Sequence, residues 1–269
     1  MKKMRLLGLL IASTFLPLTS IGQEMVRKWQ ENFKYPPTTF SIDSENNAYL
    51  GFENGGLQKF SSKGSETIAF SLPNQSSITQ IEAQNNRKIF LFYRDIQQII
   101  LLDRFSTIPR KYDLLDFGIN YAESACINPD GTFWIAENNP RTMKKVDLLR
   151  NLVVHEVQLE LGDSITMMRT TRNLLLVTSE NGLHILDQFG NLNGTIMLDG
   201  ITYLQSTNNE VLVTCTSGLV RIDPFKIEII EEIDLEEFTN SKAIMKSGSG
   251  FFVIDDQGIT LYSLANQRK

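Results

Sequence analysis

Six short apolar runs recur along the chain, each bounded by polar residues and each too short for an amphipathic helix. The runs are NAYLGFE, KIFLFYR, TFWIAE, NLLLVTS, EVLVTCT and GFFVID, which begin at Asn47, Lys88, Thr132, Asn173, Glu210 and Gly250. Branched and aromatic apolar residues dominate them, which favours strands. Because both faces of each run are apolar, these strands belong inside stacked sheets, and we predict that they are the most buried elements of the fold.

Polar turns flank these strands at regular intervals. A turn precedes the runs at Asn46-Asn47, Asn85-Asn86, Asp130-Gly131, Arg172-Asn173, Asn208-Asn209 and Gly248-Ser249, so successive turns lie about 40 residues apart. A second turn follows each of several runs, as in SENGLHILDQFGN (179–191), where Asn-Gly suits a tight hairpin. A unit of this length with four short strands is typical of a propeller blade.

The repeats predict an all-β fold, a six-bladed β-propeller of four-stranded antiparallel blades. The predicted blades cover about 39–73, 77–117, 119–161, 163–199, 200–235 and 240–264. The last copy ends without a fourth strand, and residues 25–33 precede the first copy without matching it, so we expect this N-terminal segment to complete the last blade. Such closure removes open sheet edges. A β-sandwich, two smaller β domains, and five or seven blades are the alternatives.

The N-terminus predicts a signal peptide over residues 1–22. The chain opens MKKMRLLGLL, with basic residues ahead of an apolar run that Pro17 interrupts, and the run is shorter than the roughly 20 residues that span a bilayer. No cysteine lies near the cleavage site, which argues against a lipoprotein. We therefore expect a single domain over 23–269, located in the periplasm, outside the cell or on its surface.

Charge and cysteine content narrow the class of protein. Removing the signal peptide changes the formal net charge from −5 to about −8, and no basic run remains. Nucleic acid and anionic membrane surfaces are therefore disfavoured as partners, and we expect no direct membrane insertion after signal cleavage. The two cysteines are too few for a disulfide-framed fold. Cys126 falls on an inner strand of the third blade and Cys215 on the second strand of the fifth, and we predict two separate buried thiols.

The repeats resemble known propeller families in SENNAYLGFENGGLQKF, NPDGTFWIAENN, TRNLLLVTSENGLHILD, TNNEVLVTCTSGLVRID and SGSGFFVIDDQGITLYS. This pattern is similar to the degenerate repeats of the two-component-regulator, NHL and YVTN propellers, whereas the Gly-His and Trp-Asp pairing of WD40 repeats is missing. The two-component-regulator resemblance implies a sensor linked to a kinase. This chain has no second membrane segment of its own, so such a sensor would act through a separate membrane kinase.

Few residues offer catalytic or metal-binding chemistry. We expect His155 on a fourth strand and His184 on a third strand, away from the channel, and we assign neither a catalytic role. Calcium-dependent lactonases and esterases can be six-bladed propellers with oxygen ligands at the axis. The inner-strand regions here offer Asp43, Glu82, Glu123, Asn128 and Asp163 as such ligands. These residue types also favour blade turns, so we predict no catalytic residue, no cofactor and no metal, with calcium as the alternative.

One acidic run stands out, EIIEEIDLEEF (228–238). Its acidic residues form a candidate docking patch for a basic partner, namely Glu231, Glu232, Asp234, Glu236 and Glu237. A solvated outer strand is the simpler interpretation. Taken together, the sequence predicts an exported, non-catalytic interaction module with a protein or ligand partner in the envelope, and a calcium-dependent hydrolase or a sensor subunit as alternatives.

Overall fold

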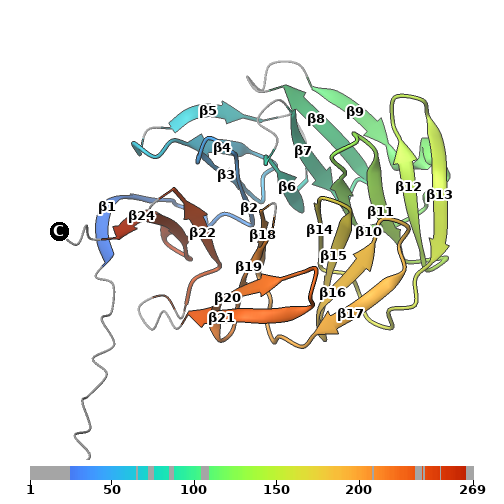
Figure 1. The fold of residues 1–269 in the computed structure, drawn as a ribbon. Coiled ribbons are helices and arrows are strands. Elements are labelled where there is room, and N and C mark those ends of the chain that lie inside the picture. Colours follow the sequence, from blue (N-terminus) through green and yellow to red (C-terminus); the bar gives the residue numbers. More distant parts are fainter. Residues whose placement is uncertain are drawn as a thin grey trace, which may run out of the picture.

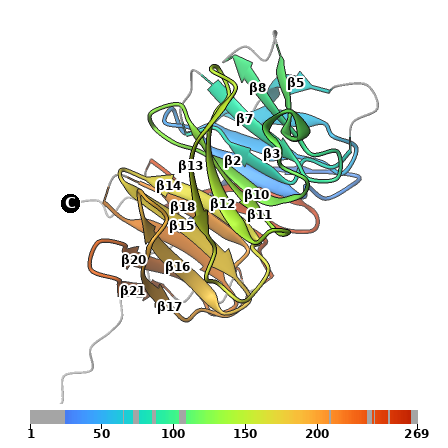
Figure 2. The same cartoon turned by 90° about the vertical axis from the view of Figure 1, so that its right-hand side faces the viewer.

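The computed structural model describes residues 25–64, 66–71, 76–84, 88–103, 109–207, 209–233, 238, 240–248 and 250–264. These residues form six four-stranded antiparallel sheets, arranged as blades around one axis (Figure 1). Figure 2 turns the right-hand side of Figure 1 toward the viewer and shows two strands of the third blade, β12 and β13, in front. The predicted signal peptide lies outside the described residues.

Within each blade the strands lie side by side from the axis outward. The first has β2 (Thr39–Ile42), β3 (Ala48–Gly51), β4 (Leu57–Phe60) and β5 (Glu66–Phe70); the second has β6 (Gln80–Glu82), β7 (Lys88–Tyr93), β8 (Gln98–Asp103) and β9 (Arg110–Asp113). The third has β10 (Ala122–Ile127), β11 (Phe133–Glu137), β12 (Thr142–Asp147) and β13 (Leu152–Gln158). The fourth has β14 (Met167–Thr171), β15 (Leu174–Ser179), β16 (Gly182–Asp187) and β17 (Leu192–Ile196); the fifth has β18 (Tyr203–Ser206), β19 (Val211–Cys215), β20 (Gly218–Asp223) and β21 (Glu228–Ile233). The sixth has β22 (Ala243–Ser247), β23 (Gly250–Ile254), β24 (Gly258–Leu264) and β1 (Met25–Asn32).

The predicted six-bladed, all-β propeller is confirmed. The second strands β3, β7, β11, β15, β19 and β23 are almost entirely buried, as their two apolar faces predicted. Between the second and third blades a single turn of 3-10 helix, η1 (Leu114–Phe117), forms part of the connection. Within the described part of the chain, no helix is long and apolar enough to cross a membrane.

The hydrophobic core lies between the blades. Six buried apolar clusters are found among the described residues, and each joins neighbouring blades around the ring; the cluster between the sixth and first blades also includes Tyr203 of the fifth. Between the second and third blades, for example, the rings of Phe90 and Phe133 stack with their centroids 5.8 Å apart. The two faces of every blade are therefore covered, which is why its middle strands carry apolar residues on both sides.

The N-terminal strand closes the ring, as predicted. Strand β1 pairs antiparallel with β24, so the first strand along the chain is the outer strand of the last blade. Only Met25 and Trp29 are partly buried in β1. A bulge between Arg27 and Trp29 shifts the register, and the indole of Trp29 lies against Phe60 of the first blade and Phe252 of the sixth. The closure thus joins two blades as well as completing one.

A glycine at the β1–β24 seam allows this close approach, and its replacement supplies a test. A Cβ atom at Gly258 would overlap the carbonyl oxygen of Glu31 in β1. We expect Gly258→Ala to lower the free energy of unfolding by about 1–3 kcal/mol, because the paired strands must separate to relieve the overlap. Gly162→Ala is the matched control, since a Cβ there meets no atom within 4 Å. Equal urea midpoints for the two variants would contradict this prediction.

Candidate functional site: the mouth of the central channel

The inner strands β2, β6, β10, β14, β18 and β22 line the axis and run in the same direction along it. Their last residues and the turns that follow them surround one end of the channel, which we call the carboxyl-end mouth. Hydrogen bonds link these strands around the axis. Ser41 accepts a bond from the backbone of Ala83 at 3.0 Å, and Thr170 donates to the carbonyl of Ile127 at 2.8 Å. The rigid inner ring fixes the positions of the polar side chains that it presents.

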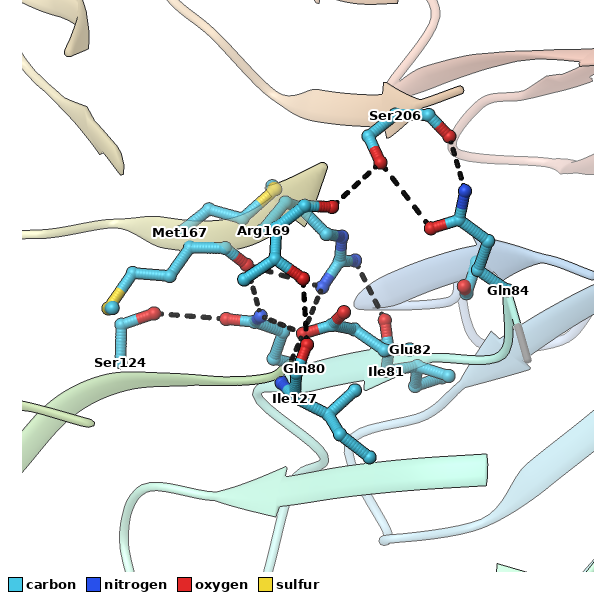
Figure 3. Close-up of polar contacts among 12 residues, drawn as sticks. Gln80, Ile81, Glu82, Gln84, Ser124, Ile127, Met167, Arg169 and Ser206 are labelled. Carbon is cyan, nitrogen blue, oxygen red and sulfur yellow. Dashed lines mark hydrogen bonds and ion pairs between the residues drawn. The ribbon is translucent and has the colours of Figure 1, made fainter. Parts of the chain in front are cut away.

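A buried polar network links the inner strands at this mouth, and two of its members, Glu82 and Arg169, line one of the cavities there (Figure 3). Arg169 on β14 reaches across to β6 of the second blade, where it donates to the carbonyl of Ile81 at 2.7 Å and lies 3.5 Å from a carboxylate oxygen of Glu82. In the opposite direction, Gln80 on β6 donates to the carbonyl of Met168 at 2.6 Å. These reciprocal contacts bind the second and fourth blades directly to each other, across the third.

The Glu82 carboxyl is the most perturbed group in the network. Its side chain is almost fully buried, and burial raises its pKa from the usual 4.5 to about 7. The guanidinium of Arg169 and the backbone N–H of Ile127, which donates to Glu82 at 3.2 Å, oppose the shift without cancelling it. Glu82 therefore changes its charge near neutral pH, which is unusual for a carboxyl group.

A second bridge spans the mouth itself. The amide of Gln84, just beyond β6, donates to the carbonyl of Ser206 on β18 at 2.7 Å, and the hydroxyl of Ser206 donates to the carbonyl of Thr170 at 2.9 Å (Figure 3). This bridge joins the second blade to the fifth, which lies opposite in the ring. It divides the mouth into two cavities of about 430 and 310 Å³, which share Glu82, Gln84, Ser206 and Thr207 in their lining.

The charges that line the mouth are mostly positive, in contrast with the acidic chain as a whole. Two carboxylates line the two cavities, and each has a cationic partner: Asp43 pairs with Lys59 at 3.5 Å and Glu82 with Arg169. The remaining charged side chains of the lining are cations, namely Lys88, Arg172 and Lys246. No ion pair links any of these three to another described residue. The mouth is therefore suited to an anionic group.

The five candidate calcium ligands do not meet at the axis, and two of them serve blade turns instead. Asp43 accepts hydrogen bonds from the backbone and side chain of Asn47 in the turn after β2, besides its pairing with Lys59. Asn128 donates to the hydroxyl of Thr132 in the corresponding turn of the third blade. Both residues thus shape the turns that their residue types favour.

Two further candidates lie at the opposite end of the channel. Glu123 accepts a hydrogen bond from the backbone of Ile165 at 3.0 Å, which ties the third blade to the fourth. Asp163 accepts a hydrogen bond from the side chain of Asn181. Only Glu82 of the five belongs to the network at the axis. Among the described residues, no group of three or more His, Cys, Asp or Glu side chains is arranged to hold a metal ion.

Only two of the five residues of the predicted acidic docking patch belong to the described residues. Glu231 and Glu232 lie exposed on β21, and Glu231 forms an ion pair of 3.1 Å with Arg221 on the neighbouring strand. The other three residues of the patch, Asp234, Glu236 and Glu237, lie outside the described residues. The patch remains a prediction.

The histidines and cysteines lie on the strands that were predicted for them from the sequence. His155 is on the outer strand β13 and His184 on β16, where Ser179 and Thr195 contact its two ring nitrogens at 2.8 and 2.9 Å. Burial lowers the pKa of His184. Both cysteines are buried free thiols, on strands β10 and β19, which confirms the prediction that they do not pair.

Sequence patterns alone did not identify the residues that dominate this site, Gln80, Gln84 and Arg169. A signal existed: polar residues recur at alternate positions, with Gln80 and Glu82 in one inner strand and Gln84 just beyond it. An arginine within the inner strand MMRTT is a second signal. Neither shows by itself that the two strands face each other across the axis.

Comparison with known proteins finds similar folds among solved structures. No protein-family model and no curated protein matches this chain. Among solved structures, the WD40 domain of Pan2 from Neurospora crassa matches with a TM-score of 0.64 and 9% identity, over 92% of this chain and 97% of that one. Virginiamycin B lyase from Staphylococcus aureus matches with a TM-score of 0.66 and 12% identity, over 90% of this chain and all of the lyase. A catalytically inactive variant of that lyase with quinupristin gives a TM-score of 0.59 at 13% identity, over the same shares.

At such low identity these likenesses show the fold alone. Together with the six blades and the repeats, they define the chain as a degenerate β-propeller repeat protein, in the broad structural class that includes WD40 propellers. The likeness to a WD40 domain extends over the whole ring although the Gly-His and Trp-Asp residues are absent. In this chain, the blades form without those residues, through polar turns and apolar middle strands.

Proposed function

We propose that this propeller is an exported, non-catalytic binding module of the cell envelope, which recognises a protein or an extracellular ligand through the carboxyl-end mouth. The observation that carries the proposal is the contrast between two sets of charged residues that line the mouth. Glu82 and Arg169 lie 3.5 Å apart as an ion pair, whereas no ion pair links Lys88, Arg172 or Lys246 to another described residue. An anionic group of the partner would meet these cations on a rigid frame.

The residues at the axis do not fit the alternative of a calcium-dependent lactonase or esterase. Calcium takes six to eight oxygen ligands, and its ligand sets usually carry several carboxylates. Here the only carboxylate of the axial network, Glu82, already faces the guanidinium of Arg169 at 3.5 Å. A second cation placed beside them would be repelled by Arg169. This donor set supports a binding role over a calcium-dependent reaction.

Charge reversal at the mouth tests the proposal. We expect the double variant Lys88→Glu/Lys246→Glu to lose the partner that the mature wild-type protein recovers from its native host by affinity capture and mass spectrometry, because the mouth no longer attracts an anionic group. Both lysines are exposed, so the fold should persist. Lys28→Glu/Lys34→Glu, with the same charge change at exposed lysines away from the mouth, is the matched control. Recovery of the same partner with the mouth variant would refute the proposal, as would a partner lost equally in both variants.

A further inference from the structure

A cavity of about 670 Å³ lies beside the first blade, on the face of the ring opposite the carboxyl-end mouth. The segment 33–35, which leads out of β1, forms one side of this first-blade cavity, and residues of the turn between β3 and β4 form another. This turn follows Gly51, which pairs with Thr39 at the start of β2, whereas the mouth lies at the end of β2. Among the described residues, none lines both the cavity and the mouth. Cavities of roughly 300–1,000 Å³ are typical of small-molecule sites.

Aromatic side chains dominate the first-blade cavity. Four of them line it and are at least partly accessible to solvent: Phe33, Tyr35, Phe52 and Phe70. The rings of Phe33 and Phe52 meet edge to face, with their centroids 5.4 Å apart. Tyr35 is 65% exposed, and the ammonium of Lys34 lies 5.2 Å from its ring centroid. Because aromatic rings gain from stacked or edge-to-face contact with other rings, beyond the burial of apolar area, this lining favours an aromatic ligand.

One polar side chain of the cavity, Gln58 on β4, lacks a hydrogen-bond partner. Its amide oxygen is buried, and no described residue donates to it. Such an unpaired acceptor lowers stability, and an apolar side chain of similar size would avoid that cost, so the fold does not explain a glutamine here. The carboxamide can turn about its last side-chain bond, which exchanges its oxygen and nitrogen. It can therefore pair with a ligand that carries either a donor or an acceptor.

The charge of the cavity favours a neutral ligand. Among the described residues of its lining, the charged ones are Lys34 and Glu53, which are exposed and of opposite sign. An anion or a cation would gain little from this balanced pair of charges, in contrast with the mouth. Recognition here depends on aromatic contact and on a hydrogen bond with Gln58.

We propose that the first-blade cavity binds a small neutral molecule with an aromatic ring and one hydrogen-bonding group. The ring packs against Phe33, Tyr35 and Phe52, and the polar group pairs with the carboxamide of Gln58. The proposal goes beyond the proposed function, because it needs no residue of the mouth and no protein partner. The two can therefore fail separately.

Matched pairs of one-ring probes test the ligand class on the mature protein. Benzamide and phenol are compared with their saturated analogues, cyclohexanecarboxamide and cyclohexanol, by titration followed by NMR. We expect each aromatic probe to bind about threefold or more tightly than its saturated analogue, because only the aromatic ring gains from contact with the rings of the lining. The probes should shift the signals of Phe33 and Phe52.

Two variants test the residues. Tyr35→Ser should weaken benzamide binding by about threefold or more without lowering the thermal midpoint, because the ring is exposed. Tyr121→Ser is the matched control, since it removes a ring that is 46% exposed and lies just before β10 of the third blade. Gln58→Met should weaken benzamide binding about fivefold and leave the binding of toluene, which has no hydrogen-bonding group, unchanged. Its thermal midpoint should not fall, because the amide oxygen has no described partner to lose.

Three results would overturn the proposal: no aromatic probe binds at millimolar concentration, aromatic and saturated probes bind equally, or Tyr35→Ser binds as tightly as Tyr121→Ser. Equal losses of benzamide and toluene binding in Gln58→Met would refute the hydrogen bond. The mouth variant Lys88→Glu/Lys246→Glu should bind benzamide as the wild type does. A loss of benzamide binding in that variant would place the site at the mouth and refute the first-blade cavity.

Discussion

Replacing Arg169 with methionine is expected to lower the free energy of unfolding by about 3–5 kcal/mol at pH 8, the largest effect that we predict for a single side chain. Methionine fills much of the space of the arginine but leaves the buried Glu82 carboxylate without its cation, which lies 3.5 Å away in the wild type. The hydrogen bond to the carbonyl of Ile81 is lost as well. Urea unfolding followed by circular dichroism measures the change.

The effect should depend on pH, and its sign follows from the raised pKa of Glu82. In the wild type this pKa is about 7 in the folded state and 4.5 when unfolded, so Glu82 contributes most to stability below 4.5 and loses that contribution as the pH rises through 7. Removing Arg169 raises the pKa further, because the carboxylate loses its neighbouring cation. The loss in Arg169→Met should therefore be smaller at pH 5, where Glu82 is protonated in both proteins, than at pH 8.

A double variant separates this charge effect from lost packing. Glu82→Gln/Arg169→Met removes both charges, and we expect it to be more stable at pH 8 than Arg169→Met alone, because no uncompensated charge stays buried. Its stability relative to the wild type should also improve from pH 5 to pH 8. An identical loss in the single and double variants at both pH values would show that the ion pair has no part in the effect.

Replacing Trp29 with alanine is expected to destabilise the ring by about 3 kcal/mol. The partly buried indole is the main side-chain anchor of β1: it lies 5.8 Å from the ring of Phe252 and 6.4 Å from that of Phe60, measured between centroids, and it donates to the carbonyl of Ser62 at 3.1 Å. Its loss removes contacts with both blades that meet at the closure. Thermal and urea unfolding measure the change, and hydrogen exchange should show β1 and β24 opening first.

Lys28→Ala is the matched control for Trp29, since the lysine occupies the bulge beside it and is exposed. This substitution should change stability by less than about 0.5 kcal/mol. If alanine at the two positions has the same small effect, then the hydrogen bonds between β1 and β24 hold the closure without the indole, and our assignment of Trp29 as its anchor is wrong.

The architecture was accessible from the sequence because local chemistry determines it. Turn residues such as Asn181-Gly182 recur at the blade period, and runs such as LLLVTS that are apolar on both faces match strands with both faces covered. The closure could also be predicted by counting strands, because the last repeat lacks a fourth strand and the segment before the first repeat supplies an additional one. These signals lie within a few residues of one another, so one sequence is enough to detect them.

The site was not accessible in the same way, because its parts lie in different blades. Arg169 and Glu82 lie on inner strands of the fourth and second blades, and they meet because the ring places these strands close together across the axis. No local pattern in either strand indicates that proximity. Acidic residues such as Asp43 and Glu123 were candidate calcium ligands because of their residue type, but each has a structural partner of its own.

The pairing of β1 with β24 also governs the order in which this molecule can be built. Trp29 belongs to the first strand of the described residues and its partner Leu261 to the last, so the seam joins residues more than 200 positions apart in the sequence. Contacts of this kind form late, because the loop that they close is long. We therefore expect β1 to dock after the other strands of the ring have formed. Until it does, β24 would be an open sheet edge, which is the kind of edge that pairs with other chains.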